Sequence, residues 1–272
     1  MPAVGAIHMK SAIGFIILLT LNMMTRSQAE TIRLYAAGSL KAALTEMAQA
    51  YEKTGTNKVE PKYGPSGLLK NEILGGAKAD VFASANMEHP ETLYAQHKGG
   101  SVVRFARNKL CALVRPGLKV DTTTLLERMV DPNVKLGTSS PKADPSGDYA
   151  YEVFAKAEKI NPGARTVLEN KALQLTGSTT SATPPAGRTV YGWHVAEGRA
   201  DIFLTYCTNA MAAKKENPEQ QIVALPDSLA VGADYGLMVI AGSSSAAQQF
   251  ADFIMSSAGQ EILVGHGFTS GK

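Results

Sequence analysis

Residues 34–44 read LYAAGSLKAAL. The run begins with apolar residues typical of a buried strand, turns at Gly38-Ser39, and continues with apolar residues at helical spacing as far as Tyr51. A strand that passes through small residues directly into a helix leaves backbone N–H groups unpaired at the helix start. Ser39 is placed either to cap these groups or, together with them, to bind an anion.

The same strand-to-helix pattern recurs along the chain. Strands separated by helices of about ten to fifteen residues are typical of βαβ units and a largely parallel sheet. The sequence therefore predicts an α/β protein. Extended runs are expected at 31–37, 57–64, 79–85, twice within 101–117, and at 133–139, 199–207 and 220–226; helices are expected at 40–53, 66–77, 87–100, 121–131, 146–160 and 208–216, and two within 243–268.

Three of these corners place a serine among small residues: Gly38-Ser39, the Gly-Pro-Ser-Gly run at 64–67 and the Pro-Ser-Gly run at 145–147. In doubly wound sheets, ligands bind beyond the carboxyl ends of the strands, where helices begin. Each corner can offer a hydroxyl and backbone N–H groups to one oxygen, and helix N-termini add partial positive charge. At any single corner a helix cap is the simpler interpretation. The repetition favours a shared oxyanion site that needs no Arg or Lys.

The N-terminus has the pattern of an export signal. A lysine precedes the apolar run 12–24, and Ser27-Gln28-Ala29 is a small-x-small cleavage sequence. The run is shorter than the ~20 residues of a membrane span. We therefore predict a signal peptide at 1–29, starting at Met1 or Met9, and a periplasmic mature protein. In that oxidising compartment Cys111 and Cys207 form a disulfide or remain two buried thiols.

The composition argues against several classes of function. The net charge is only +3 and no basic block occurs, which argues against nucleic acid as a partner. The five histidines, which show no metal-ligand spacing, are His8, His89, His97, His194 and His266. No G-x-S-x-G, P-loop or dinucleotide fingerprint is present, so we predict a protein that is not an enzyme and holds neither a metal cation nor a cofactor.

Five motifs together resemble those of the periplasmic molybdate-binding proteins of ABC transporters. They are, in order, LYAAGSLKAAL, YGPSGLLKNEI, AKADVFASAN, DPSGDYAYEVF and ADIFLTYCTNA, and the resemblance covers about residues 31–270. It implies the type II periplasmic-binding-protein fold, in which crossing strands join two α/β lobes, each a mostly parallel sheet flanked by helices. The lobes would comprise 30–108 plus 228–272 and 109–227.

The resemblance also implies a ligand site of hydrogen-bond donors only. The donors that it implies are the Ser39 and Ser66 hydroxyls, the backbone N–H groups of Ser146 and Val190, and the Tyr206 hydroxyl. The expected ligand is molybdate or tungstate, and the expected partner is an ABC transporter permease that receives it from a monomeric binding protein. Hinge closure of the lobes over the ligand would accompany binding.

Three departures from that family keep other ligands open. The loop 175–188 is longer than is usual, a serine stands at position 146 where alanine is common, and Trp193-His194 follows the loop. These differences are compatible with intact molybdate binding and equally with a pocket reshaped for sulfate, a phosphate-like anion or a small carboxylate. The alternative from another class is a secreted enzyme on the same fold. Arg188, if directed into the cleft, would favour a carboxylate.

Overall fold

The computed structural model describes residues 1–3 and 29–271. The signal peptide predicted at 1–29 lies almost entirely outside these residues. The strands are β1 (Thr31–Ala37), β2 (Lys58–Gly64), β3 (Val81–Ser84), β4 (Val103–Val114), β5 (Leu136–Ser139), β6 (Leu173–Thr176), β7 (Ile202–Tyr206), β8 (Gln221–Ala224), β9 (Gly232–Val239) and β10 (Thr269–Ser270). The helices are η1 (Gly38–Leu40), α1 (Lys41–Glu52), α2 (Ser66–Leu74), α3 (Glu88–Ala95), α4 (Leu125–Val130), α5 (Pro145–Ile160), α6 (Ala164–Lys171), α7 (Val190–Ala196), α8 (Cys207–Glu216), α9 (Ser245–Met255) and α10 (Ser257–Gly265).

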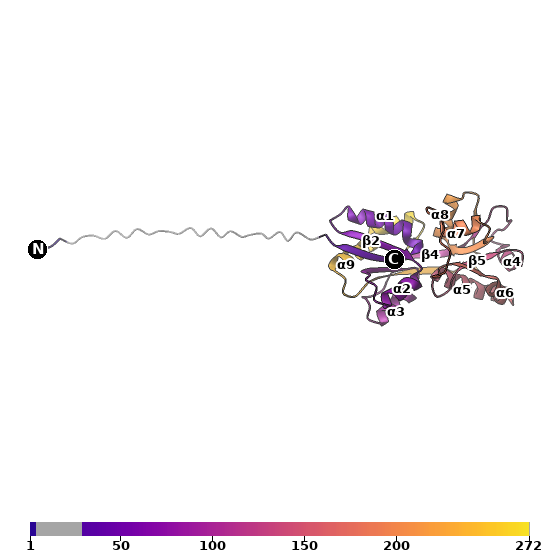
Figure 1. Ribbon diagram of the computed structural model, residues 1–272, viewed down its shortest axis with the longest axis horizontal. Coiled ribbons are helices and arrows are strands. Elements are labelled where there is room, and N and C mark those ends of the chain that lie inside the picture. Colours follow the sequence, from indigo (N-terminus) through magenta and orange to yellow (C-terminus); the bar gives the residue numbers. More distant parts are fainter. Residues whose placement is uncertain (4–28, 272) are drawn as a thin grey trace.

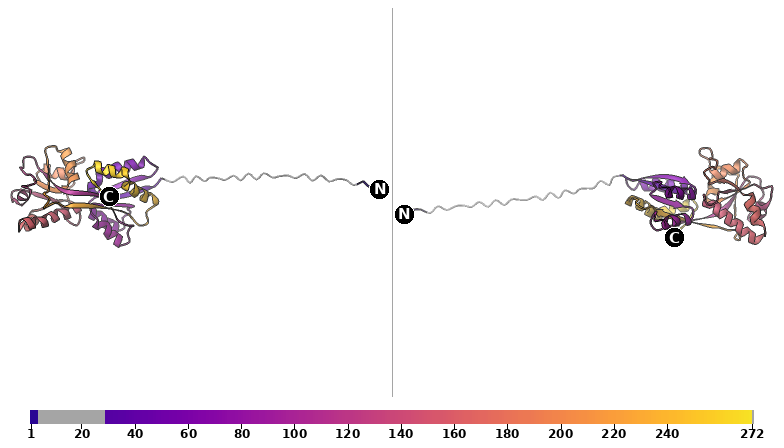
Figure 2. Two further views of the ribbon diagram at one scale, coloured as in Figure 1. Left: turned by 180° about the vertical axis from the view of Figure 1, so that it is seen from behind. Right: turned by 60° about the horizontal axis from the view of Figure 1, so that its bottom comes forward.

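Two lobes lie side by side, joined by long strands (Figure 1). The strand order is β2-β1-β3-β9-β4-β7-β5-β6, with β8 and β10 also paired to β4. We call the side built on β1, β2 and β3 the first lobe and the side built on β5, β6 and β7 the second lobe. Both views in Figure 2 show the same two groups of elements, with the C-terminal end in the first lobe. The molecule therefore has the two-lobed α/β architecture expected from the sequence.

β4 runs through both lobes. Its segment Val103–Lys109 pairs with β9, and its segment Leu110–Val114 pairs with β7. The outer strands of each lobe form parallel ladders, whereas every pairing made by β4 and β9 is antiparallel. The strands that connect the lobes are therefore the antiparallel part of the sheet. The run 101–117, expected as two strands, contains this single long one.

The predicted faces of the first strand and helix are buried as expected. In β1, Ile32 and Leu34 alternate with exposed neighbours, and α1 buries Ala43, Leu44 and Met47 at helical spacing. Fully burying an aliphatic side chain such as Leu44 contributes about 1.5–3 kcal/mol, so this face anchors the turn at Gly38-Ser39.

Aromatic rings fill the junction of the lobes. Tyr235 on β9 lies 5.6 Å from the Tyr206 ring, 6.3 Å from Phe105 and 5.5 Å from Phe268, measured between centroids. Such tilted and edge-to-face pairs contribute about 0.5–1.5 kcal/mol beyond the area that they bury. The aromatic cluster therefore packs against both connecting strands, since Phe105 lies on β4 and Tyr235 on β9.

The two cysteines form a disulfide, Cys111–Cys207, with Cα atoms 4.9 Å apart. Cys111 lies on β4 and Cys207 begins α8, so the bond fixes the first turn of α8 to a strand that crosses between the lobes. Of the two alternatives that the sequence left open, the structure has the disulfide.

Several elements were not expected from the sequence: α6, α7, β6, β9 and β10. β9 begins at a glycine and contains Gly236, so it lacks a continuous β-branched run. A Cβ at Gly236 would lie 2.7 Å from Pro90 Cγ, which explains the glycine there. α7 is a single short helix directly after a loop rich in proline and glycine, and its periodicity is too brief to recognise.

Candidate functional site

A cavity of about 180 Å³ lies between the two lobes. Four of the five residues predicted to bind the ligand line it: Ser39, Ser66, Val190 and Tyr206. Ser39 and Ser66 come from the first lobe, whereas Val190 and Tyr206 come from the second. The structure therefore brings together side chains that are as far as 167 positions apart in the sequence.

The three serines do not cap their helices. Ser39 lies inside η1, and Ser66 is the first residue of α2; the residues that precede these two elements make no side-chain cap. The cap of α5 is Asp144, whose carboxylate accepts the backbone N–H of Ser146 at 3.1 Å. The simpler interpretation of the corners, in which each serine is a helix cap, is therefore wrong.

Ser39 is connected to the strands that cross between the lobes. Its Oγ lies 3.0 Å from the hydroxyl of Tyr235, and Asn108 Nδ2 donates to that same hydroxyl at 3.3 Å. Asn108 Nδ2 also donates to Thr208 Oγ1 of α8 at 2.8 Å. Asn108 lies on β4 and Tyr235 on β9. This chain of hydrogen bonds orients Ser39 from the connecting strands.

Ser66 and Tyr206 meet at one residue of the first lobe. Ser66 Oγ accepts the backbone N–H of Ala85 at 3.1 Å, and the Tyr206 hydroxyl donates to the carbonyl of Ala85 at 3.4 Å. Both side chains are about 99% buried apart from the cavity that they line. Because Ser66 Oγ accepts rather than donates in this bond, its own proton is available to a ligand.

The phenols of the cavity remain donors at neutral pH. Burial raises the pKa of Tyr206 well above its ordinary value, and the charge of Asp144 adds to the effect. Burial likewise raises the pKa of Tyr191, while the hydroxyls of Ser139, Thr205 and Ser146 lower it. A protonated phenol donates a hydrogen bond and carries no charge, which suits an anionic ligand.

Ser146 itself does not line the cavity, and Asp144 does. Ser146 is fully buried, and its backbone N–H, the donor predicted for the ligand, is already taken by the Asp144 carboxylate. Burial raises the pKa of Asp144 to about 6. The third corner therefore brings a carboxylate to the site where the sequence predicted only a donor.

Sequence reasoning missed Asp144 and Tyr191. A signal for Asp144 was present, because aspartate directly before Pro145 is a stronger cap signature than a serine after it. Tyr191 gave no signal, since it lies in α7, which the sequence did not reveal.

Two hydrogen bonds to backbone carbonyls join the lobes beside the cavity. The N–H of Gly67, at the start of α2, donates to the carbonyl of Ala143 in the second lobe at 2.9 Å. A Cβ at Gly67 would lie 2.2 Å from the carbonyl oxygen of Lys142, so only glycine allows this approach. The Tyr206–Ala85 bond crosses between the lobes as well. The structure is thus one in which the lobes touch around the site.

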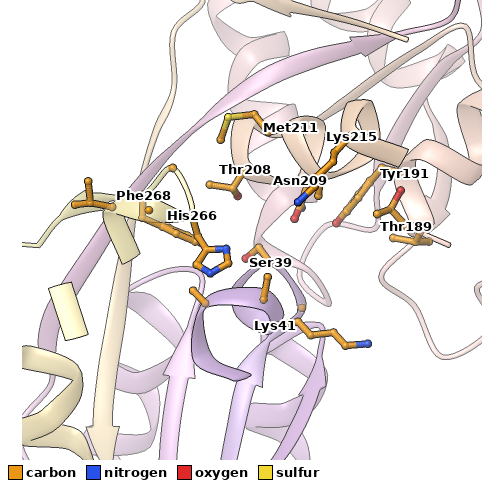
Figure 3. A pocket seen from close by; sticks show the side chains of 18 residues that line it. Ser39, Lys41, Thr189, Tyr191, Thr208, Asn209, Met211, Lys215, His266 and Phe268 are labelled. Atoms are coloured by element: carbon orange, nitrogen blue, oxygen red, sulfur yellow. The ribbon is translucent and has the colours of Figure 1, made fainter. Parts of the chain in front are cut away.

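A larger cavity of about 570 Å³ adjoins the first and shares Gly38, Ser39, Val190 and Tyr191 with it. Figure 3 shows Lys215 reaching from α8 toward Ser39, with Tyr191 beside it. Lys41, on the first lobe, and His266 also line this space; His266 pairs with Glu46. The residues that line it include no acid, so this part of the cleft favours negative charge.

Three further residues that the sequence singled out, Arg188, Trp193 and His194, line neither cavity. Arg188 pairs with Glu216 and lines neither cavity, so it does not recognise a carboxylate in the cleft. Trp193 and His194 are buried within α7, where Trp193 stacks under the Arg199 guanidinium at 4.0 Å. This departure from the resembled family therefore lines neither cavity.

Within residues 1–3 and 29–271, no cluster of three or more His, Cys, Asp or Glu side chains could hold a metal ion. None of the helices described here is long and apolar enough to cross a membrane.

Residues 32–269 match the family described as bacterial extracellular solute-binding protein. An uncharacterised protein of Pasteurella multocida, PM1146, is 35% identical over 207 residues, which are 76% of this chain and 86% of that one. The molybdate-binding protein ModA of Escherichia coli is 25% identical over 251 residues, 88% of each chain.

The solved structure of AfuA, a periplasmic binding protein from Actinobacillus pleuropneumoniae with bound fructose-6-phosphate, superposes with a TM-score of 0.72. It is 14% identical, and the match covers 89% of this chain and 85% of that one. At this identity the likeness concerns the fold alone.

Proposed function

Because the chain belongs to the family of bacterial extracellular solute-binding proteins, we propose that it binds a tetrahedral oxyanion between its lobes and delivers it to an ABC transporter permease. Molybdate and tungstate are the first ligands to consider, since the Escherichia coli relative is named a molybdate-binding protein. The predicted signal peptide at 1–29 would export the chain to the periplasm.

One observation carries this proposal: Ser39, Ser66 and Tyr206 converge on a cavity of about 180 Å³ from three different elements. Each presents a hydroxyl, and none of the residues that line this cavity is Lys, Arg or His. Hydrogen bonds from hydroxyls, together with the backbone N–H at the start of a helix, can compensate a buried anion without a cation. Such a site recognises a tetrahedral anion by its size and by its negative charge.

Binding would be coupled to the position of the lobes. The ligand would contact Ser39 and Ser66 on the first lobe and Val190 and Tyr206 on the second, so all contacts exist only when the lobes are together. The Gly67–Ala143 bond would hold that closed form, whereas the Tyr206 hydroxyl, which carries a single proton, would exchange the Ala85 carbonyl for the ligand. The permease would then recognise the closed protein as the loaded one.

A second candidate ligand is a substituted oxyanion such as a phosphate monoester. The adjoining cavity of about 570 Å³ favours it, because Lys41 and Lys215 line that space and no acid does. The anionic head would lie at the serines and the substituent beyond Ser39. Inorganic oxyanions would leave this larger cavity to water.

Thermal unfolding of residues 30–272 with millimolar molybdate, tungstate, sulfate, phosphate, a phosphate monoester and small carboxylates tests both candidates. A ligand at a hundred times its Kd adds about 2.7 kcal/mol to the free energy of unfolding, which is a clear shift of the midpoint. Stabilisation by carboxylates alone, with no oxyanion effective, would refute the proposal.

Matched serine variants test the site itself. Ser39→Ala and Ser66→Ala each remove a hydrogen bond to a charged ligand, so affinity should fall by about 1.5–3 kcal/mol, roughly 10- to 150-fold. The control is Ser256→Ala, because Ser256 caps α10 and lies outside both cavities. That variant should lose about 1 kcal/mol of stability and no ligand affinity.

A further inference from the structure

Asp144 is an acid held inside a site that otherwise consists of neutral donors. It lines the same cavity as Ser39, Ser66 and Tyr206, and its Oδ1 lies 3.1 Å from the backbone nitrogen of Ser146. Gly177, at φ 91°, packs directly against it: a Cβ there would lie 2.6 Å from Asp144 Cβ. The carboxylate is thus fixed at the cavity wall by α5 on one side and by the backbone after β6 on the other.

Within the part of the chain that the structure describes, none of the residues that line the cavity with Asp144 carries a positive charge. From its own helix Asp148 adds a second negative charge, and the Asp148 carboxylate is bound to the backbone N–H of Lys142. β2, α7 and β7 contribute Tyr63, Tyr191 and Tyr206, which are neutral phenols. An ionised Asp144 would therefore repel an oxyanion and also occupy the N–H predicted to bind it.

Building on the proposed oxyanion function, we propose that Asp144 and one ligand oxygen share a single proton in the complex. A proton-bearing oxyanion such as hydrogen phosphate brings that proton itself. A fully deprotonated dianion such as molybdate binds only when Asp144 takes one proton from solution. Asp144 is then the residue that distinguishes these two classes of oxyanion.

The surroundings of Asp144 raise the pKa of its carboxyl to a value at which it changes protonation between pH 5 and 8. Burial raises its pKa to about 6, and the Ser146 N–H and Ser139 hydroxyl oppose this in part. Above that pH Asp144 is ionised in the free site, so the binding of each molybdate must be accompanied by the uptake of one proton from solution. Molybdate affinity should then fall by up to about tenfold per pH unit above pH 6, whereas hydrogen phosphate should show no such loss.

The experiment is titration calorimetry of residues 30–272 with molybdate and, separately, with phosphate, at pH 8. Each titration is run in two buffers of different ionisation enthalpy, which counts the protons taken up per ligand. Asp144→Asn is the test variant, because asparagine retains an oxygen to cap α5 and carries no charge. Asp148→Asn is the control, since it removes a charge from the same helix outside the cavity.

The wild type and Asp148→Asn should take up close to one proton per molybdate and close to none per phosphate. Asp144→Asn should take up no proton with either anion. At pH 8 it should bind molybdate more tightly than the wild type does, and it should no longer favour phosphate over molybdate. Molybdate binding by the wild type without proton uptake, matched by Asp144→Asn, would overturn the role of Asp144 and leave the oxyanion function intact. If neither anion binds at any pH between 5 and 8, the role of Asp144 falls together with molybdate as the ligand, whereas the oxyanion function itself falls only if the phosphate monoester and sulfate fail as well.

Discussion

Gly67→Ala tests whether the lobe contact seen here is the ligand-bound geometry. The N–H of Gly67 donates to the carbonyl of Ala143 across the cleft at 2.9 Å. A Cβ at position 67 would lie 2.2 Å from Lys142 O and 2.8 Å from Ala143 O. Both are backbone atoms and cannot swing aside, so the lobes must separate to accept the methyl group.

The size of the effect follows from these contacts. Losing the interlobe hydrogen bond costs about 1 kcal/mol, and inserting a methyl group into a packed contact costs about 1–3 kcal/mol more. Affinity should therefore fall at least about tenfold. When the lobes are apart the clash is absent, and alanine in a helix is favoured over glycine by up to about 1 kcal/mol. The free protein should melt at the same temperature or higher while ligand binding weakens.

Calorimetry with the anion that stabilises the wild type, together with small-angle scattering, measures both consequences. The radius of gyration of Gly67→Ala should stay large when ligand is added, whereas that of the wild type should decrease. Gly55→Ala is the matched control, because nothing lies within 4 Å of a Cβ at that position. Unchanged affinity and normal compaction in Gly67→Ala would refute the closure geometry.

Three further outcomes are expected. Replacing Cys111 and Cys207 by alanine should lower the free energy of unfolding by up to about 4–5 kcal/mol, since the bond closes a loop of 96 residues; an unchanged denaturant midpoint would contradict this. Burial lowers the pKa of His89 to about 4, so the unfolded chain binds more protons between pH 4 and about 6.5. Stability should therefore rise with pH across that window, by up to about 3 kcal/mol, and His89→Gln should flatten the profile. Tyr235→Phe should weaken ligand binding about fivefold by freeing Ser39 from its partner, although Tyr235 lines neither cavity; equal calorimetric affinities would argue against that coupling.

Local sequence patterns determined the frame of this protein. The apolar alternation of β1 and the helical spacing of α1 are consequences of short-range geometry, so they could be predicted together with the turn at Gly38-Ser39. The order of strands and helices indicated the α/β class, and the motifs pointed to Ser39, Ser66 and Tyr206, which the structure places around one cavity.

Tertiary structure decided how these residues meet around the cavity. The cap of α5 is the exception, because Asp144 accepts the N–H of Ser146 only two residues along the chain and the aspartate before Pro145 was a signal for it. The disulfide, the Tyr235–Ser39 contact and the approach of Gly67 to Ala143 join segments up to 196 residues apart. Such contacts depend on how the two lobes meet, and that arrangement is set by long-range packing for which a local sequence pattern carries no signal.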